Sequence, residues 1–275
     1  MKPARFDYVR AESLAEAHDV LAAEGGEASV LAGGQSLLPL LSTRLARPKI
    51  VLDIMRIPGL DVISRESDAI RIGAAVRQAR LAAWPELVSA QPLLAAALPF
   101  IGHAQTRSRG TVCGSIAHAD PSAEIPLILL ALEGEILLSS ARGQRRVSAG
   151  EFFTGLMSTA REEHELVEAA IVPRRRPGHG YAFREFARRH GDFAIVACAA
   201  IANERKARLA VGGVADRPVA FDGLPLGGTP LDEALDRIAG ELDARDDLHA
   251  SADYRRHLVR RLGRASIVEA SRCRA

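Results

Sequence analysis

Two glycine-bearing segments have the residue types that could hold a phosphate group. They are residues 30–37, with the sequence VLAGGQSL, and residues 109–120, with the sequence RGTVCGSIAHAD. Glycine lets the backbone approach a ligand closely and adopt positive φ, so that successive N–H groups can converge on an anion. Ser36, Thr111 and Ser115 add hydroxyl donors. Each segment therefore predicts an anion-binding loop followed by a helix N-terminus.

Neither segment matches the best-known phosphate-binding patterns. The G-x-G-x-x-G spacing of a Rossmann fingerprint and the G-x-x-x-x-G-K-[ST] spacing of a P-loop are both absent from them. A glycine pair directly after a strand, such as Gly33-Gly34, more often forms a tight turn than a ligand site. One loop alone is therefore weak support for a phosphate site.

Other side chains do not indicate hydrolytic or metal-dependent chemistry. The histidines have no H-x-x-x-H or H-E-x-x-H spacing, and no nucleophile–base arrangement can be identified. Cys113, Cys198 and Cys273 are too far apart to suggest a disulfide framework or a cysteine-ligated cluster within the chain. We therefore expect no catalytic residue and no metal ligand here, and we expect Cys198 to lie in the core.

The composition is typical of a globular protein that does not bind nucleic acid. The 275 residues are 48% hydrophobic and 25% charged, and the formal net charge is only +2. Aromatic residues, at 4%, offer few platforms on which bases could stack. The first residues contain no apolar signal region, and the longest apolar run, residues 125–132, is too short to span a bilayer. We expect a cytoplasmic protein with no membrane span.

Periodicity and capping outline the elements that must position the two loops. Strands are expected at 28–31, 49–53, 70–73, 135–139 and 165–172, and helices at 14–21, 36–45, 76–83, 92–101 and 121–132. The first of these helices begins with a capping box formed by Ser13 and Glu16. The first glycine loop would thus join a short strand to a helix that Ser36 could cap.

A change of pattern near residue 175 predicts a domain boundary. Residues 173–180 are rich in proline, glycine and arginine, and Arg174–Arg176 within them is expected to be a solvated linker. Beyond it, three strands at 181–188, 194–202 and 207–211 precede two helices at 230–242 and 254–270. Strands followed by helices predict a small α+β domain with a three-stranded sheet.

The two loops together resemble those of a known family. Residues 32–39, AGGQSLLP, and residues 110–121, GTVCGSIAHADP, are similar to the FAD-binding medium subunit of molybdenum hydroxylases. The aerobic carbon monoxide dehydrogenase medium subunit and the xanthine dehydrogenase flavin domain are its reference members. The resemblance extends to residues 51–54, 151–155 and 186–194, so it covers essentially the whole chain.

The resemblance implies an α+β fold with two domains. Residues 1–174 would form an FAD-binding domain of the vanillyl-alcohol-oxidase (PCMH) type, with lobes at about 1–54 and 55–174 and FAD between them. Residues 178–275 would form the C-terminal medium-subunit domain. FAD would be held without a covalent link, its pyrophosphate between residues 32–36 and 111–115.

The resemblance also implies which residues contact FAD. They are Ala32, Gly33, Gly34, Gln35, Ser36 and Leu37 in the first loop, Thr111, Val112, Cys113, Gly114, Ser115 and Ala117 in the second, and Ile101, Asp120, Glu124, Leu166 and Phe193 elsewhere. Phe193 matches a position beside the isoalloxazine ring. Some of these residues have a simpler alternative. Asp120 could cap the following helix, Glu124 could be a solvated helix charge, and Ile101 and Leu166 could be core residues.

Two positions depart from the family pattern. Cys113 replaces a common glycine, which would be costly if its φ were positive; we expect that it is not. We also expect the Cys113 thiol to be inactive in redox chemistry, since reactivity needs an activating charge. Glu185 replaces a lysine that is common near the flavin. A negative charge there would disfavour the anionic reduced flavin, unless Glu185 points elsewhere.

The resemblance finally implies a role in a larger complex. The chain would be the flavin subunit of a molybdenum-containing hydroxylase or dehydrogenase, in which FAD accepts electrons from iron–sulfur clusters and passes them to an external acceptor. Its partners would be a large molybdopterin subunit and a small subunit with two [2Fe-2S] clusters, as a dimer of heterotrimers. The alternative is a free-standing FAD-dependent oxidoreductase that acts on a small organic substrate. Carbon monoxide, a purine and an N-heteroaromatic compound all remain open as substrates of the complex.

Overall fold

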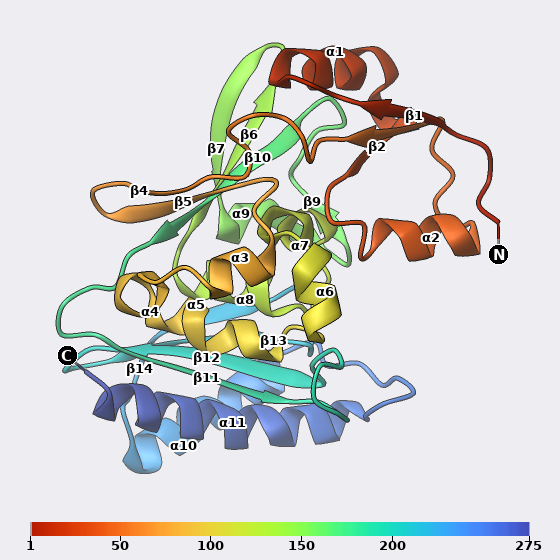
Figure 1. Ribbon diagram of the computed structural model, residues 1–275. Helices are drawn as coiled ribbons and strands as arrows, with labels where there is room; N and C mark the ends of the chain where they lie inside the picture. The colour runs from red at the N-terminus through yellow and green to blue at the C-terminus, as the bar shows by residue number, and fades with distance from the viewer. Residues whose placement is uncertain (1, 275) are drawn as a thin grey trace.

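The chain begins with a three-stranded parallel sheet that leads into the first glycine loop (Figure 1). The computed structural model describes residues 2–274. The sheet has the order β1-β3-β2, with β1 (Asp7–Arg10), β2 (Ala28–Leu31) and β3 (Ile50–Asp53). They are connected by α1 (Leu14–Glu24), the 3-10 turn η1 (Gly25–Glu27) and α2 (Leu37–Thr43). Ser13 caps α1 by accepting a hydrogen bond from the Glu16 N–H at 3.1 Å, as predicted.

A five-stranded antiparallel sheet follows in the order β4-β5-β10-β6-β7. Its strands are β4 (Ile63–Arg65), β5 (Ala69–Gly73), β6 (Glu135–Ser140), β7 (Gly143–Ser148) and β10 (Leu166–Pro173). The central strand β10 is buried at every residue except its last. α9 (Ala149–Phe152) and the paired strands β8 (Phe153–Gly155) and β9 (Ser158–Thr159) connect β7 to β10.

A layer of short helices lies between this sheet and the C-terminal one (Figure 1). It consists of α3 (Gln78–Ala82), α4 (Leu87–Ala90), α5 (Pro92–Ala97), η2 (Leu98–Phe100), α6 (Ala104–Arg109), α7 (Val112–His118) and α8 (Glu124–Ala131). α8 is buried at every residue, because it packs on β12 and β13 on one side and on α5 and α7 on others. A helix surrounded by protein is apolar all round, which explains the uninterrupted run that the sequence shows.

The segment before α8 differs from the prediction. The helix expected at 121–132 begins at Glu124, and its N-cap is Ala123, which makes no side-chain cap. Asp120 Oδ1 instead accepts a hydrogen bond from the Ser122 N–H at 2.8 Å. This local bond holds residues 120–123 in a turn. Asp120 therefore stabilises a turn, and the prediction that it caps the helix was wrong.

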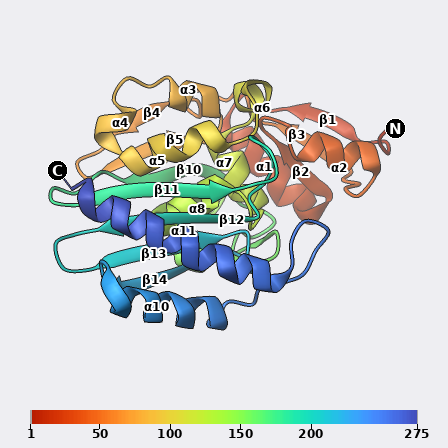
Figure 2. The ribbon, with the colours of Figure 1, turned by 90° about the horizontal axis from the view of Figure 1, so that it is seen from below.

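The C-terminal sheet has four antiparallel strands, so the prediction of three was wrong. The order is β11 (Gly180–Phe186), β12 (Val196–Ala202), β13 (Ala207–Gly212) and β14 (Val219–Leu224). β14 is an edge strand whose register shifts between Ala207 and Leu209 of its partner. Its partial exposure leaves it without the strong apolar pattern that marks a buried strand. α10 (Gly228–Glu241) and α11 (Ala252–Arg272) cover the outer face (Figure 2).

The basic segment between β10 and β11 is docked on the protein. The Arg174 N–H donates to Asp68 O at 2.8 Å and its guanidinium donates to Ser67 O at 3.1 Å. The Arg175 N–H donates to Ala90 O at 2.7 Å. Only Arg176 is exposed, while Arg174 and Arg175 are half-buried. The prediction of a solvated linker was therefore wrong for two of its three arginines.

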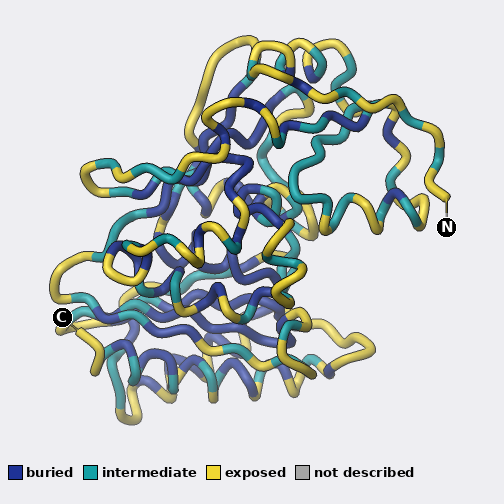
Figure 3. Tube along the Cα trace, in the orientation of Figure 1, coloured by how far each residue is buried: buried dark blue, intermediate teal, exposed yellow. Residues whose placement is uncertain are grey.

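Burial is greatest where the helical layer meets the two sheets (Figure 3). Cys198, in the middle of β12, is fully buried as predicted. Phe183 of β11 and Ala197 of β12 belong to the same hydrophobic cluster as the helical layer, so the inner face of the C-terminal sheet shares a core with the N-terminal part. The outer face of the sheet forms a second cluster with α10 and α11. Within residues 2–274, no helix combines the length and the apolar character needed to cross a membrane.

Candidate functional site

The first glycine loop packs against the second through bare backbone. A Cβ atom on Gly33 would lie 2.2 Å from Arg109 O and 2.7 Å from Gly110 Cα. Real Cβ atoms do not approach a backbone that closely, so only glycine permits this contact. Gly34 has φ +73°, which also favours glycine. The glycine pair is thus required both for the turn and for the contact between the loops.

The second loop is fixed by hydrogen bonds to the first residue of α3 and to the segment just before it. The Gln78 N–H donates to Gly110 O at 2.8 Å, and the Val112 N–H donates to Val76 O at 3.1 Å. Thr111 caps α7, because its Oγ1 accepts from the Gly114 N–H at 3.0 Å. A Cβ on Gly114 would lie only 2.7 Å from that oxygen. The loop therefore offers the cavity a fixed, tightly packed surface.

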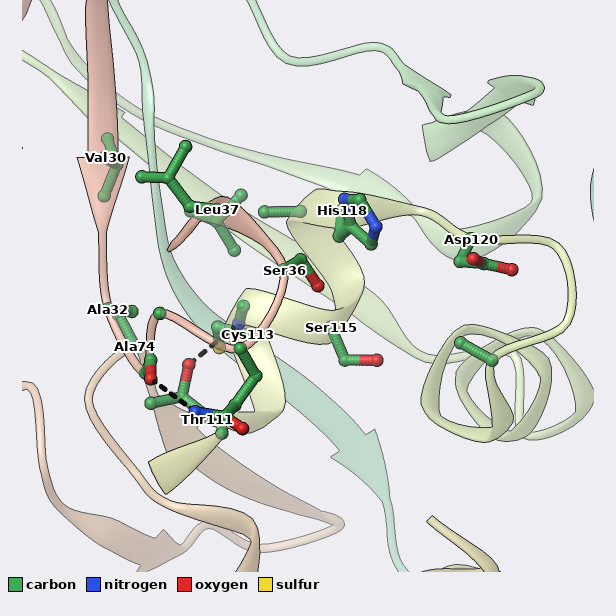
Figure 4. A pocket seen from close by; sticks show the side chains of 18 of the residues that line it. Val30, Ala32, Ser36, Leu37, Ala74, Thr111, Cys113, Ser115, His118 and Asp120 are labelled. Carbon is green, nitrogen blue, oxygen red and sulfur yellow. Dashed lines mark hydrogen bonds between the residues drawn. The ribbon is translucent and has the colours of Figure 1, made fainter. Parts of the chain in front are cut away.

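The two loops differ in the donors they leave free. Among the described residues, the N–H groups of residues 33–36 donate to no backbone acceptor. In the second loop, the N–H groups of Val112 and Gly114 already have acceptors, so they cannot contribute to the predicted converging set. Free N–H groups therefore come mainly from the first loop, and the second adds the Ser115 hydroxyl (Figure 4). Backbone N–H groups at a glycine turn are suited to an anionic ligand.

The loops border a cavity of about 340 Å³ (Figure 4). Ser36 and Ser115 project into it from opposite loops, and Leu166 from β10 lies in its wall. Phe193, which is 64% exposed, lies at its rim on the loop between β11 and β12. A concave, mostly apolar site with a few polar groups is typical of small-molecule and cofactor binding.

The structure brings the predicted residues together in this cavity, with one exception. Those that line it are Ala32, Gly33, Gly34, Gln35, Ser36, Leu37, Ile101, Thr111, Cys113, Gly114, Ser115, Ala117, Asp120, Glu124, Leu166 and Phe193. Val112 does not, because it is the first residue of α7 and its side chain is buried in the core. Helical periodicity places consecutive residues of α7 on different faces.

Cys113 lies in the cavity wall with its side chain buried. Its thiol donates to Ile72 O at 3.4 Å, and burial raises its pKa to about 12. A thiol with so little thiolate is a poor nucleophile. Its backbone is helical and its φ is not positive, so the replacement of glycine at this position creates no strain.

The cavity wall also contains an ion-paired carboxylate that the sequence did not suggest. Glu165 accepts hydrogen bonds from Arg145 at 2.6 and 2.8 Å and from the Glu162 N–H at 2.8 Å. Burial alone would raise the pKa of Glu165, but these donors outweigh it and lower the pKa. Arg161 beside it donates to the Glu165 carbonyl at 2.8 Å. No motif at residues 161–165 marks them as part of a site.

Several further lining residues were also missed. They are Ala28, Ser29, Val30, Leu40, Ile54, Ala74, Gln78, Thr106, Gly110, His118, Ala123 and Val167. Of these, Gly110, His118, Ala123 and Val167 lie directly beside a predicted residue, and the fold brings the other eight to the cavity. No group of three or more His, Cys, Asp or Glu residues within the described part of the chain is arranged to hold a metal ion.

Family models assign the class of protein. Residues 4–175 match the FAD-binding domain in molybdopterin dehydrogenase, and residues 181–270 match the CO dehydrogenase flavoprotein C-terminal domain. The glycine-loop cavity belongs to the first of these, with Phe193 contributed by the second. The fold and the cavity therefore define an FAD-binding flavoprotein.

Individual relatives narrow this class to a family. The 6-hydroxypseudooxynicotine dehydrogenase complex subunit alpha of Paenarthrobacter nicotinovorans is 37% identical, over 98% of this chain and 96% of its own length. The carbon monoxide dehydrogenase medium chain of Hydrogenophaga pseudoflava is 35% identical, over 93% of each chain. The solved structure of carbon monoxide dehydrogenase from the same organism has a TM-score of 0.95 with 32% identity over 100% of both chains. For quinoline 2-oxidoreductase from Pseudomonas putida 86 the TM-score is 0.92, with 33% identity over 99% of both chains.

The chain belongs to the FAD-binding medium subunits of the molybdenum hydroxylases, as its sequence indicated. It is the flavoprotein subunit of an oxidoreductase of the carbon monoxide dehydrogenase and xanthine dehydrogenase type.

Proposed function

We propose that the chain holds FAD without a covalent bond in the cavity between its two glycine loops. The observation that carries this proposal is the contact between the loops, where residues 33–36 line the same cavity as Ser115 and their N–H groups donate to no backbone acceptor among the described residues. These donors fit a pyrophosphate. Leu166 and Ile101 offer apolar surface, and Phe193 at the rim is suited to cover one face of the flavin ring.

The domain organisation that we propose follows from the same arrangement. Residues 1–174 form the FAD-binding domain of the vanillyl-alcohol-oxidase (PCMH) type, with lobes at about 1–54 and 55–174, and residues 178–275 form the C-terminal domain. The parallel sheet lies in the first lobe and the five-stranded sheet in the second, which supports a cofactor site between two lobes.

The proposed role is electron transfer within a complex. FAD supplies the redox chemistry; this chain binds it, orients it and shields part of it from water. Electrons arrive from two [2Fe-2S] clusters on a small partner subunit and leave to an external acceptor, while a large molybdopterin subunit oxidises the substrate. We expect a cytoplasmic dimer of heterotrimers. Relatives that match nearly the whole chain are named as subunits of dehydrogenase complexes, which favours this role over a free-standing oxidoreductase.

The loop assignment is tested by adding a negative charge to either loop. We expect the wild-type chain to bind FAD and show its absorbance bands, and Gly34→Asp or Gly114→Asp to weaken binding by more than about 100-fold, because like charges placed together cost several kcal/mol. Gly150→Asp is the matched control, since a Cβ on this exposed glycine meets nothing within 4 Å. Wild-type FAD affinity in both loop variants would disprove the assignment.

The proposed complex is tested by isolating the chain with its native partners. We expect one larger and one smaller subunit to co-purify with it. Metal analysis should find molybdenum and iron in the assembly. Neither metal is expected on this chain alone. A native assembly that oxidises its substrate yet contains no molybdenum and no iron would overturn the three-subunit arrangement.

A further inference from the structure

The C-terminal sheet presents a carboxyl group to the FAD-binding domain. Side chains alternate along a strand, so Glu185 of β11 lies on the same face as Phe183, whose ring packs on Phe100 of η2 at 5.2 Å between centroids. Arg184 lies on the opposite face, where it pairs with Glu269 of α11 at 2.7 Å. Glu185 therefore faces the helical layer and not the face of the sheet that α11 covers.

Small residues beside Glu185 let α8 pack closely on the sheet. Ala197 is paired with Glu185, and Gly212 is paired with Ala197 on the next strand. A Cβ on Gly212 would lie 3.3 Å from the Leu127 side chain, so the first turns of α8 lie directly on this row. Leu127 is three residues after Glu124 and shares its side of the helix. The packing thus brings Glu124 and Glu185 to one junction between the domains.

Neither of the two carboxyl groups forms an ion pair within residues 2–274. Glu124 lines the cavity and is only 4% exposed, while Oε2 of Glu185 is buried and has no hydrogen-bond partner. Burial raises the pKa of Glu124 to about 7, with a smaller contribution from Asp120. Burial also raises the pKa of Glu185 to about 8, and the charge of Glu124 adds to the effect. Two nearby carboxylates in a buried site resist double ionisation.

The charged groups on adjoining elements do not neutralise the pair. Asp120 adds negative charge, and Arg161 in the cavity wall is engaged with backbone carbonyls. Arg184 faces away from the junction. His118 ends α7, and His190 lies against Phe100 at 6.4 Å between ring centroids. α5, η2 and β12 contribute no Asp, Glu, Lys, Arg or His.

We propose that Glu124 and Glu185 form a proton-storing pair behind the FAD cavity, which binds a proton from solvent when negative charge enters the cavity. Added negative charge favours the neutral form of each carboxyl, so a carboxylate and a proton become a carboxylic acid. Glu124 takes up the proton at the cavity wall, and Glu185 lies behind it. This inference rests on the proposed FAD site, because the negative charge that causes the proton uptake is the charge of the reduced flavin.

The test is the pH dependence of the flavin midpoint potential in the FAD-loaded full chain, measured from pH 6 to 9. One additional proton taken up with two electrons changes the equilibrium tenfold per pH unit, which is about 30 mV. In the wild type we expect this additional slope above about pH 7. Glu185→Gln, which leaves the cavity lining intact, should lose the additional slope of the potential above about pH 8. The double variant that carries both Glu185→Gln and Glu124→Gln should lose the additional slope over the whole pH range.

Glu269→Gln is the matched control, since it removes a carboxylate from the opposite face of β11 and should keep the wild-type profile. If the wild type and Glu185→Gln show the same dependence of midpoint potential on pH, the proposed proton-storing pair is wrong. Loss of FAD binding by the wild-type chain itself would instead contradict the proposed cofactor site, so the two failures are distinguishable by absorbance before any potential is measured.

Discussion

Gly33→Ala is expected to weaken FAD binding by roughly 30- to 100-fold, because the new methyl group has no space. Its carbon would lie 2.2 Å from Arg109 O and 2.7 Å from Gly110 Cα. Both are backbone atoms, so the neighbour cannot move aside by changing a rotamer. Forcing such an atom into a packed site costs about 2–3 kcal/mol, and the strain would separate the loops where the pyrophosphate is proposed to lie. FAD titration followed by flavin fluorescence measures the effect.

Gly240→Ala separates this effect from the general consequences of adding a methyl group. Gly240 lies in α10, and a Cβ there meets nothing within 4 Å. The control should bind FAD like the wild type and be slightly more stable, since alanine favours helices over glycine. The account of the loop contact fails if Gly33→Ala keeps wild-type affinity while its melting temperature also stays unchanged.

Arg255→Met is expected to cause the largest loss of stability, about 3 kcal/mol. Arg255, near the start of α11, is 5% exposed. Its guanidinium donates to Ile195 O at 2.7 Å and Gly213 O at 2.6 Å, and it also pairs with Asp247. Hydrogen bonds to a charged group contribute about 1.5–3 kcal/mol each, and methionine would leave both carbonyls buried without a donor. Thermal unfolding should show a melting temperature lower by roughly 6–12 °C.

The adjacent arginine provides the control for this variant. Arg256 pairs with Asp253, whose side chain is 96% exposed, and such surface pairs contribute little. Arg256→Met should change the free energy of unfolding by less than about 0.5 kcal/mol. Equal losses in the two variants would contradict the special role of the buried guanidinium. Because Ile195 follows Phe193 by two residues, Arg255→Met should also loosen the cavity rim, which FAD affinity would report.

Local sequence patterns predicted most elements around the site. The capping box at Ser13, the glycine pair after β2 and the apolar run of α8 each depend on neighbours in the chain, so they could be recognised without the fold. β14 could not, because an edge strand with one partly exposed face lacks a strong apolar pattern. The start of α8 was missed for a related reason. The Asp120–Ser122 hydrogen bond competes with the helix, and propensity alone does not reveal which wins.

By itself, the sequence determined the family and the cofactor class, since the two loops are contiguous motifs whose residue types can be read directly. Only the tertiary structure decided how the motifs are used. It directed the side chain of Val112 into the core and placed Phe193 at the cavity rim. It also left the free N–H groups mainly on the first loop. It also brought Glu185 to Glu124, because Ala197 and Gly212 let α8 pack against the C-terminal sheet. Contacts between residues so distant in the chain depend on packing, which no local pattern encodes.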